Sequence, residues 1–246
     1  MKKIMIVLCL AGLGQRFIKK GYKIPKFLLP SKNNNITILE LILKNFISSG
    51  NDEFILMLNT RNKNWKKNIQ NIGKKLNITL HINFISDTKG QAETAFLATK
   101  IIEKDFNNDY KNKPIAFHNG DTILLNRDLN TINKIINNSI DGVIDTFNSA
   151  SENFSYTSVN SEGLVEEIIE KRVISKTATT GLYVFSNCKT YGELYKKMNK
   201  SHKELFISDV YIEALNSGLK IFNIHNENPK DTIILGTPQE YEDWLK

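Results

Sequence analysis

A continuous apolar run near the start of the chain constrains the fold more than any other feature. Residues Ile4–Leu10 form this run, which leads directly into a segment that holds Gly12 and Gly14. Such a run is typical of a strand buried on both faces of a parallel sheet. It is too short for a membrane span, which needs ~18 apolar residues, and it precedes a glycine loop rather than a cleavage site. We therefore expect a buried first strand and no membrane segment.

Strand-like and helix-like patterns then alternate as far as Phe147. The expected strands are Ile4–Leu10, Phe54–Leu58, Ile78–Ile85, Ile115–His118 and Gly142–Phe147, and the expected helices are Thr37–Ser49, Trp65–Leu76, Ala92–Glu103 and Leu129–Asn137. Strands that alternate with helices predict a mainly parallel sheet covered on both faces.

The pattern changes between Ser155 and Phe185, where short strand signals follow one another with few helical breaks. This change predicts a mixed or antiparallel patch on the same sheet. The later elements are expected at Tyr156–Val159, Leu164–Glu170 and Gly181–Phe185 (strands), Tyr191–Met198 and Ser208–Asn216 (helices), Ile221–Ile224 (edge strand) and Pro238–Leu245 (helix). Asn33–Asn35 is expected to be a loop, not a boundary. The prediction is a single α/β domain over residues 1–246, with a Rossmann-like, mainly parallel but mixed sheet.

The net charge of +7 favours acidic partners in general. Only four of the 33 cationic residues are arginine, and the lysines are spread along the chain without a dense basic tract or interleaved aromatic residues. We therefore do not expect nucleic-acid binding. Two interpretations remain: a lysine-rich solvated surface, or a few cations lining a pocket for a small polyanion.

The two cysteines, Cys9 and Cys188, lie among apolar residues and provide no disulfide framework. We expect reduced thiols in the core, as in a cytoplasmic protein. The four histidines lack the spacing of zinc ligands, so no zinc site is expected.

The segment Ala11–Leu29 is expected to be a long loop because glycine and proline recur in it. In open α/β sheets, ligands bind beyond the carboxyl ends of the strands. Gly12 and Gly14 would let backbone N–H groups approach phosphate oxygens. A dinucleotide site would need a third glycine where Phe17 stands and a helix that starts at once, and we expect neither.

Two cations, Arg16 and Lys26, accompany this glycine loop. A guanidinium and an ammonium beside a glycine turn suit a triphosphate. The alternative is a tight turn with solvent-exposed cations. Asp121 follows Asn119-Gly120 after a buried strand, where a carboxylate could bind Mg²⁺. The alternative there is a turn with a solvent-facing aspartate.

Three further segments have two interpretations each. Gly90-Gln91 opens a helix whose first N–H groups could bind an acceptor edge, or it is a plain helix start. Glu170-Lys171 lies at the end of a strand and belongs either to a functional site or to a surface ion pair. Thr180-Gly181 lies at the start of a strand, where it belongs to a functional site or Gly181 forms a β-bulge.

In their order along the chain, these segments resemble the nucleotidylyltransferases that activate sugar phosphates and similar small phosphates. The matching segments are Ala11–Phe17, Gly21–Lys26, Gly90–Ala95, Asn119–Asp121, Glu170-Lys171, Thr180–Tyr183 and Gly236–Pro238. The resemblance covers nearly the whole chain. It is strongest to the short members found with capsule and surface-polysaccharide genes, a subgroup that includes cytidylyltransferases for non-sugar phosphates such as phosphoglutamine.

The resemblance implies roles for individual residues. Arg16, Lys26 and Asp121 would be catalytic, with Arg16 at the β,γ-phosphates, Lys26 at the α- or acceptor phosphate and Asp121 on Mg²⁺. The implied nucleotide-binding residues are Leu10, Ala11, Gly12, Gly14, Gly90 and Gln91, and the implied acceptor-binding residues are Glu170, Lys171, Thr180 and Gly181. Larger relatives carry a second metal aspartate just before the late glycine, where this chain has Ile234-Leu235. Asp231 or Asp209 could replace it, or Asp121 could act with water and phosphate oxygens.

The implied reaction joins a nucleoside triphosphate, with CTP favoured, to a small phosphorylated acceptor and releases pyrophosphate. The acceptor would be a sugar 1-phosphate or a non-sugar phosphate, and Mg²⁺ would be the cofactor. Residues up to about 125 would bind the nucleotide and the remainder the acceptor, and a homodimer is possible. Two alternatives stay open: an inactive nucleotide-binding regulatory protein, and a glycosyltransferase that uses an NDP-sugar. The second would need a D-x-D metal motif, which the chain lacks.

Overall fold

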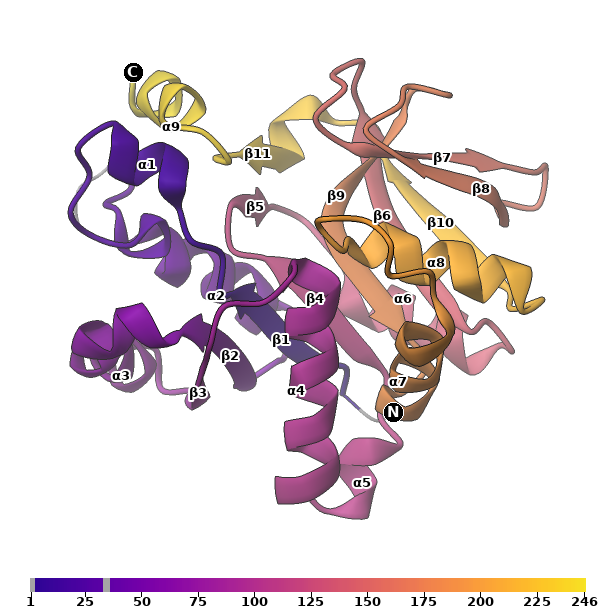
Figure 1. Ribbon diagram of the computed structural model, residues 1–246, viewed down its shortest axis with the longest axis horizontal. Coiled ribbons are helices and arrows are strands. Elements are labelled where there is room, and N and C mark those ends of the chain that lie inside the picture. Colours follow the sequence, from indigo (N-terminus) through magenta and orange to yellow (C-terminus); the bar gives the residue numbers. More distant parts are fainter. Residues whose placement is uncertain (1–2, 33–35) are drawn as a thin grey trace.

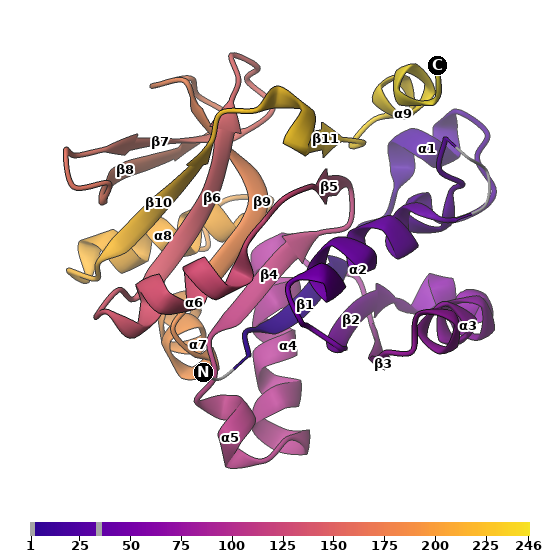
Figure 2. The ribbon, with the colours of Figure 1, turned by 180° about the vertical axis from the view of Figure 1, so that it is seen from behind.

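The computed structural model describes residues 3–32 and 36–246, so the loop predicted at Asn33–Asn35 lies outside the described residues. Within them, nine strands form one sheet (Figures 1 and 2). Seven run in the order β10–β6–β9–β4–β1–β2–β3, and β7 and β8 extend the sheet from β9 as a hairpin. Their bounds are β1 Met5–Leu10, β2 Glu53–Asn59, β3 Thr79–Ile85, β4 Ile115–Asn119, β6 Gly142–Asn148, β7 Ser155–Val159, β8 Val165–Glu170, β9 Thr177–Phe185 and β10 Ile221–Asn226.

The sheet is mixed but mainly parallel, as predicted. Strand β1 pairs in parallel with β2 and β4, and β10 pairs in parallel with β6. Strand β9 runs antiparallel to both β4 and β6. The expected antiparallel patch after Ser155 is therefore real, and it consists of β7, β8 and β9. The strand at Ile221 lies at the edge of the sheet, also as expected.

Helices cover both faces of the sheet because side chains alternate along each strand. In β1, Ile6 and Leu8 point into one core, and Met5 and Val7 point into the other. Helices α2 (Ile38–Ser48), α3 (Lys66–Leu76) and α6 (Leu129–Asn137) pack on the first face, and α4 (Gln91–Asp105), α7 (Cys188–Lys197) and α8 (Ile207–Asn216) pack on the second. In the described parts of the chain, no helix is long and apolar enough to cross a bilayer.

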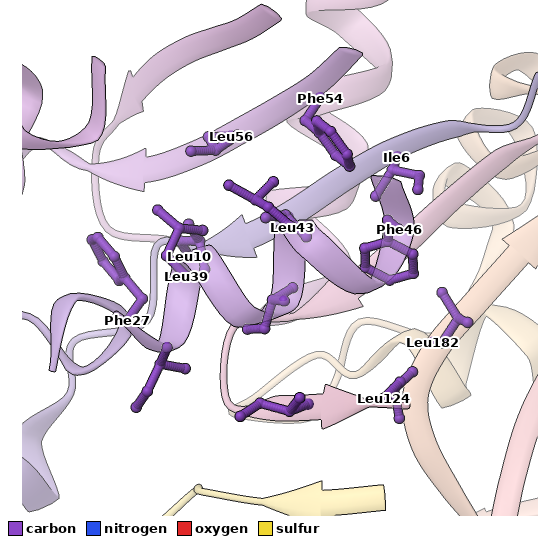
Figure 3. Close-up of a cluster of buried hydrophobic side chains, with 14 of the residues drawn as sticks. Ile6, Leu10, Phe27, Leu39, Leu43, Phe46, Phe54, Leu56, Leu124 and Leu182 are labelled. Atoms are coloured by element: carbon purple, nitrogen blue, oxygen red, sulfur yellow. The ribbon is translucent and has the colours of Figure 1, made fainter. Parts of the chain in front are cut away.

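Buried apolar side chains hold α2 against the sheet. Figure 3 shows Leu39 and Leu43 of α2 among Ile6 and Leu10 of β1 and Phe54 of β2. All five are buried, and each contributes on the order of 1.5–3 kcal/mol relative to an exposed position. A capping box fixes where α2 begins, since the Glu40 N–H donates to Thr37 Oγ1 at 3.2 Å and the Thr37 N–H donates to Glu40.

The long loop expected over Ala11–Leu29 is only partly correct. Helix α1 (Gln15–Lys19) begins directly after Gly14, and the short helix η1 (Lys26–Leu28) closes the segment. Gly14 has a φ of 61°, and its carbonyl accepts the N–H groups of Phe17 and Ile18 in α1. The expectation that no helix starts at once is therefore wrong. A glycine in the left-handed region can stop one segment and start a helix within one residue.

A small antiparallel sheet that follows β4 has no counterpart among the predicted elements. It consists of β5 (Thr122–Leu124) and β11 (Thr232–Ile234), with η3 (Pro229–Asp231) before β11. Other elements without a predicted counterpart are α5 (Asn108–Lys111) and η2 (Thr60–Trp65). Three-residue strands carry too little pattern to be seen alone.

The carboxyl edge of the sheet, where β1 and β4 end and β9 begins, gathers the predicted site. The closing helix α9 (Pro238–Leu245) lies beside α1 in both ribbon views (Figures 1 and 2). The Tyr22 hydroxyl donates to Glu242 at 3.1 Å, and the Phe17, Tyr22 and Tyr241 rings form edge-on and tilted contacts. Helix α9 thus packs against the segment that follows the glycine loop.

Candidate active site

The centre of the candidate site is an ion pair between Lys26 and Asp121. Lys26 Nζ donates to Asp121 Oδ2 at 2.8 Å, and the two side chains are 19% and 32% exposed. Burial raises the pKa of Asp121, but the charge of Lys26 and its hydrogen bond more than offset this, so the pKa lies below its usual range. At neutral pH the site therefore holds an ionised carboxylate in contact with Lys26, although the two residues are 95 positions apart in sequence.

The turn that presents Asp121 is held from several sides. Burial lowers the pKa of His118 to about 4, so the imidazole is neutral at pH 7. Its Nε2 lies 2.9 Å from the Thr122 carbonyl, which only accepts, so Nε2 carries the proton. The Leu235 N–H donates to the Asp121 carbonyl at 2.7 Å. A side chain at Gly120 would overlap Leu10, which ties this turn to the end of β1.

The glycine loop leaves an open approach to this pair. A Cβ at Gly12 or Gly14 would meet no atom of the described chain within 4 Å. Arg16 is exposed on α1, and the next residue, Phe17, has its ring centre 5.7 Å from Lys26 Nζ. The structure brings the loop to Lys26 and Asp121 and leaves the guanidinium of Arg16 facing solvent, where an anion can reach it.

The start of α4 lies against a segment far away in sequence. Gly90 has a φ of 144°, and a Cβ there would overlap the backbone of Leu205. The Ala92 N–H donates to the Leu205 carbonyl at 3.0 Å, so the chain itself uses one of the first N–H groups of this helix. The Gln91 side chain donates to Asn119 Oδ1 at the end of β4. Gln91, a predicted nucleotide-binding residue, is therefore joined to the Asn-Gly-Asp turn.

Two of the predicted acceptor residues, Glu170 and Lys171, lie in a second cluster. The Glu170 carboxylate accepts hydrogen bonds from the Ser155 hydroxyl and, at 2.8 Å, from the Ser208 hydroxyl. Burial raises the pKa of Glu170, and these hydroxyl donors lower it only in part. Lys171 Nζ lies 3.9 Å from Glu170 Oε1 and 4.2 Å above the ring centre of Phe206. The alternative of a surface ion pair is only partly correct. Lys171 lies at the surface, but Glu170 is mostly buried.

Gly181 is a β-bulge, the alternative considered for this segment. Its φ is 88°, and the register between β6 and β9 shifts at this point. A side chain at Gly181 would overlap the side chain of Asn119, so the bulge brings β9 directly against the end of β4. Thr180 lies just before it, and its hydroxyl donates to Asp145 Oδ2 at 2.7 Å. The predicted nucleotide and acceptor residues thus meet at Asn119.

The two aspartates predicted as metal ligands are not brought together. The Leu235 N–H bonds to Asp121 at one end of the β5–β11 sheet, and the Leu125 N–H bonds to Asp231 at the other. At about 3.4 Å per residue, this spacing separates the two backbones by roughly 13 Å. The Asp231 carboxylate accepts from Asn126 instead. Asp209 accepts the Phe206 N–H at the start of α8.

The acidic side chain that the structure does place near Asp121 is Glu240. From the position of a Cβ on Gly236, Glu240 Oε2 lies 3.5 Å away and Asp121 Oδ2 lies 3.7 Å away. In the sequence, Glu240 is recognisable only as the second half of the Thr237 capping box. Over residues 3–32 and 36–246, no group of three or more His, Cys, Asp or Glu side chains could hold a metal by itself. One carboxylate completed by phosphate oxygens and water still suits Mg²⁺.

The overall fold is shared with solved protein structures. No curated protein sequence matches the chain. Similar solved structures include the nucleoside-diphosphate-sugar pyrophosphorylase from Vibrio cholerae RC9, with 26% identity, a TM-score of 0.86 and coverage of 98% of this chain and 99% of that chain. A Bacillus anthracis protein, provisionally assigned as a glucose-1-phosphate thymidylyltransferase and solved with sucrose, has 17% identity, a TM-score of 0.77 and coverage of 99% and 94%. A UDP-glucose pyrophosphorylase solved with UDP-glucose has 16% identity, a TM-score of 0.76 and coverage of 99% and 97%.

The similarity to the last two structures shows a shared fold, and the family is shown by a match to a family model. The model of the nucleotidyl transferase family matches residues 5–243, nearly the whole chain. The chain therefore belongs to the nucleotidyl transferase family, and it is a nucleotidyltransferase.

Proposed function

We propose that this enzyme joins a nucleoside triphosphate to a small phosphorylated acceptor, forming a nucleoside-diphosphate-activated product and pyrophosphate. The observation that carries the proposal is the Lys26–Asp121 ion pair beside an open glycine loop and next to Asn119. An acceptor of the sugar-phosphate class is supported by the solved relative from Vibrio cholerae, which is a nucleoside-diphosphate-sugar pyrophosphorylase.

In the proposed reaction, a phosphate oxygen of the acceptor attacks the α-phosphorus in line and pyrophosphate leaves. No strong general base is needed, because a phosphate monoester has a second pKa near 6 and is mostly dianionic at pH 7. The protein holds two anions together and neutralises the charge of the leaving group. Arg16 would bind the leaving phosphates, and Lys26 and Lys171 would bind the α- and acceptor phosphates.

Asp121 is the residue we propose as the Mg²⁺ ligand, with Asp231 too distant to share the ion. A bound Mg²⁺ would neutralise phosphate charge at this carboxylate. Lys26 donates to Asp121 Oδ2, and the Thr122 hydroxyl donates to Oδ1 at 3.5 Å. Each carboxylate oxygen can accept more than one partner, so either could also hold a cation. Lys26 would then exchange the carboxylate for a phosphate oxygen when the nucleotide binds.

The finer assignments are also proposals. We infer a division at about residue 125 between a nucleotide-binding part and an acceptor-binding part. CTP as the nucleotide, a role in capsule or surface-polysaccharide synthesis, a cytoplasmic location and a homodimer rest on the resemblance to the short capsule-linked members. A sugar 1-phosphate and a non-sugar phosphate such as phosphoglutamine remain the two acceptor candidates.

The first test is a thermal-shift panel of CTP, UTP, GTP, ATP and dTTP with Mg²⁺. A ligand present at 100 times its Kd stabilises a protein by about 2.7 kcal/mol. For a chain of this size, the melting temperature should rise by roughly 5–11 °C with the correct nucleotide. Pyrophosphate release with sugar 1-phosphates or phosphoglutamine would then identify the acceptor. A shift without pyrophosphate release would favour an inactive binding protein, and a shift with NDP-sugars alone would favour a glycosyltransferase.

A further inference from the structure

A buried ion pair lies behind the candidate site and plays no part in the proposed chemistry. Arg127 Nε donates to both carboxylate oxygens of Asp145, at 3.1 and 3.0 Å, and the two side chains are 4% and 1% exposed. All four arginines of the chain lie in the described residues, and the other three are exposed. Taking two charges out of water is costly, and a well-packed apolar pair often stabilises a fold equally well. The pair therefore calls for an explanation other than stability.

The remaining donors of Arg127 hold one end of the β5–β11 sheet. Nη1 donates to the carbonyls of Leu125 and Asp231 at 2.9 and 3.2 Å, and Nη2 donates to Thr232 Oγ1 at 2.7 Å. An isolated pair of three-residue strands is at best marginally stable, so this sheet depends on external contacts. Its other end carries Asp121, whose carbonyl accepts the Leu235 N–H at 2.7 Å. Arg127 therefore supports the element that presents the central carboxylate.

The remaining acceptors of Asp145 reach the other half of the site. Asp145 Oδ2 accepts from Thr180 at 2.7 Å, and Oδ1 accepts from Asn226 at 2.7 Å. Thr180 lies directly before the Gly181 bulge, which presses on Asn119, the partner of Gln91. One ion pair is thus bonded to both the support of Asp121 and the strand that carries the predicted acceptor residues.

We propose that Arg127 and Asp145 are positioning residues that set the β5–β11 sheet, and with it Asp121, relative to β6 and β9. This inference rests on the proposed nucleotidyl transfer at Asp121. Lysine could replace the charge of Arg127 but not the planar set of donors that reaches four acceptor groups at once. That requirement explains an arginine here in a chain whose cations are almost all lysine.

The test compares turnover in three variants that leave the proposed ligand-binding residues unchanged. Arg127→Lys keeps the charge and loses the fork. Thr232→Val removes one hydroxyl from the β5–β11 sheet. Arg127→Met with Asp145→Leu removes both charges together, so that neither is left buried alone. A misplacement of about 1 Å can reduce turnover 10²-fold, so we expect kcat to fall by tenfold to 10²-fold in the arginine variants and less in Thr232→Val. The KM for the nucleotide should stay within about twofold, because the glycine loop is untouched.

A matched core variant separates positioning from stability. Ile102→Val shortens a buried side chain of α4, in the core on the opposite face of the sheet from α2 and α6. Even if Ile102→Val lowers the melting temperature as much as the Arg127 variants do, we expect it to keep the wild-type kcat. If Arg127→Lys and the double variant fold and keep kcat within twofold, the inference is wrong. If neither folds, Thr232→Val decides, and unchanged kcat there also overturns it. Absence of pyrophosphate release from the wild-type enzyme would instead refute the proposed function, independently of Arg127.

Discussion

The two halves of the carboxyl edge treat their polar groups in opposite ways. In the nucleotide half, Arg16 is exposed, Gly12 faces open space and Lys26 has one carboxylate partner. In the acceptor half, Glu170 is bonded to two serine hydroxyls, and Thr180 is bonded to a buried aspartate. The polar groups of the nucleotide half are open to an anionic ligand, whereas those of the acceptor half are already hydrogen-bonded to neighbouring side chains.

This difference indicates separate tasks for the two halves. Charges that face water cost little to maintain and can bind or release a charged ligand quickly. Buried and bonded polar groups are fixed in place, and losing one partner leaves the other unsatisfied. We therefore expect changes at the exposed residues of the nucleotide half, such as Arg16 and Gly12, to affect turnover without affecting stability. Changes in the acceptor half should affect both.

Asp121→Asn should have the largest effect on turnover. The amide keeps the shape and can still accept from Lys26, but it removes the negative charge at the centre of the site. Loss of one preorganised charged group reduces kcat by about 10²–10³-fold. Because Lys26 holds the pKa of Asp121 below its usual range, the carboxylate also stabilises the fold at neutral pH, and we expect a small fall in the melting temperature as well. Pyrophosphate release measures the loss of turnover. Asp243→Asn, an exposed position on α9, is the control, and near wild-type turnover in Asp121→Asn would remove this carboxylate from the mechanism.

Arg16→Ala should have the next largest effect. The guanidinium is exposed, so its removal should leave the melting temperature unchanged. Because it would bind the leaving phosphates, we expect kcat to fall by about tenfold to 10²-fold, less than for Asp121 because water screens an exposed charge. Arg61→Ala removes an equally exposed arginine that pairs with Asp87 on the surface. Equal turnover in the two variants would mean that Arg16 only carries surface charge.

Gly12→Ala and Gly90→Ala should separate open space from close packing. Gly90 combines a φ of 144° with a backbone contact at Leu205, so alanine there should cost about 1–3 kcal/mol of stability. Gly12 has no such contact among the described residues, so its alanine variant should melt normally but bind nucleotide less tightly. Thermal melts with and without nucleotide measure both effects. Normal nucleotide affinity in Gly12→Ala would show that no phosphate approaches this loop closely.

Local sequence signals are stronger in the nucleotide half than in the acceptor half. Ile4–Leu10, Gly12, Gly14 and Lys26 lie close together in the chain, and their pattern indicates a strand followed by an anion-binding turn. Strand alternation was equally visible and predicted the sheet and its helices. The glycines added one error, because helix α1 starts immediately after Gly14.

The missed features depend on partners distant in sequence. Leu205 against Gly90, Arg127 against Asp145 and β5 against β11 join segments whose pairing no local pattern reveals. Asp231 is a predicted metal ligand only because larger relatives carry a second metal aspartate just before the late glycine. The antiparallel pairing of the β5–β11 sheet instead carries it to the end opposite Asp121.

The pH dependence of stability offers the smallest but most specific contrast between the halves. Burial raises the pKa of Glu170, whereas Lys26 keeps that of Asp121 below its usual range. A carboxyl with a raised pKa contributes stability that is full below its unfolded pKa, about 4.3, and is lost as pH rises through its folded pKa. The melting temperature of Glu170→Gln should therefore gain on that of the wild type between pH 4 and pH 7. Glu167→Gln, exposed on the same strand, should show no such trend. A constant difference between Glu170→Gln and the wild type would mean that the folded acceptor half accommodates the charge as well as water does, and the contrast between the two halves would then lie in their contacts alone.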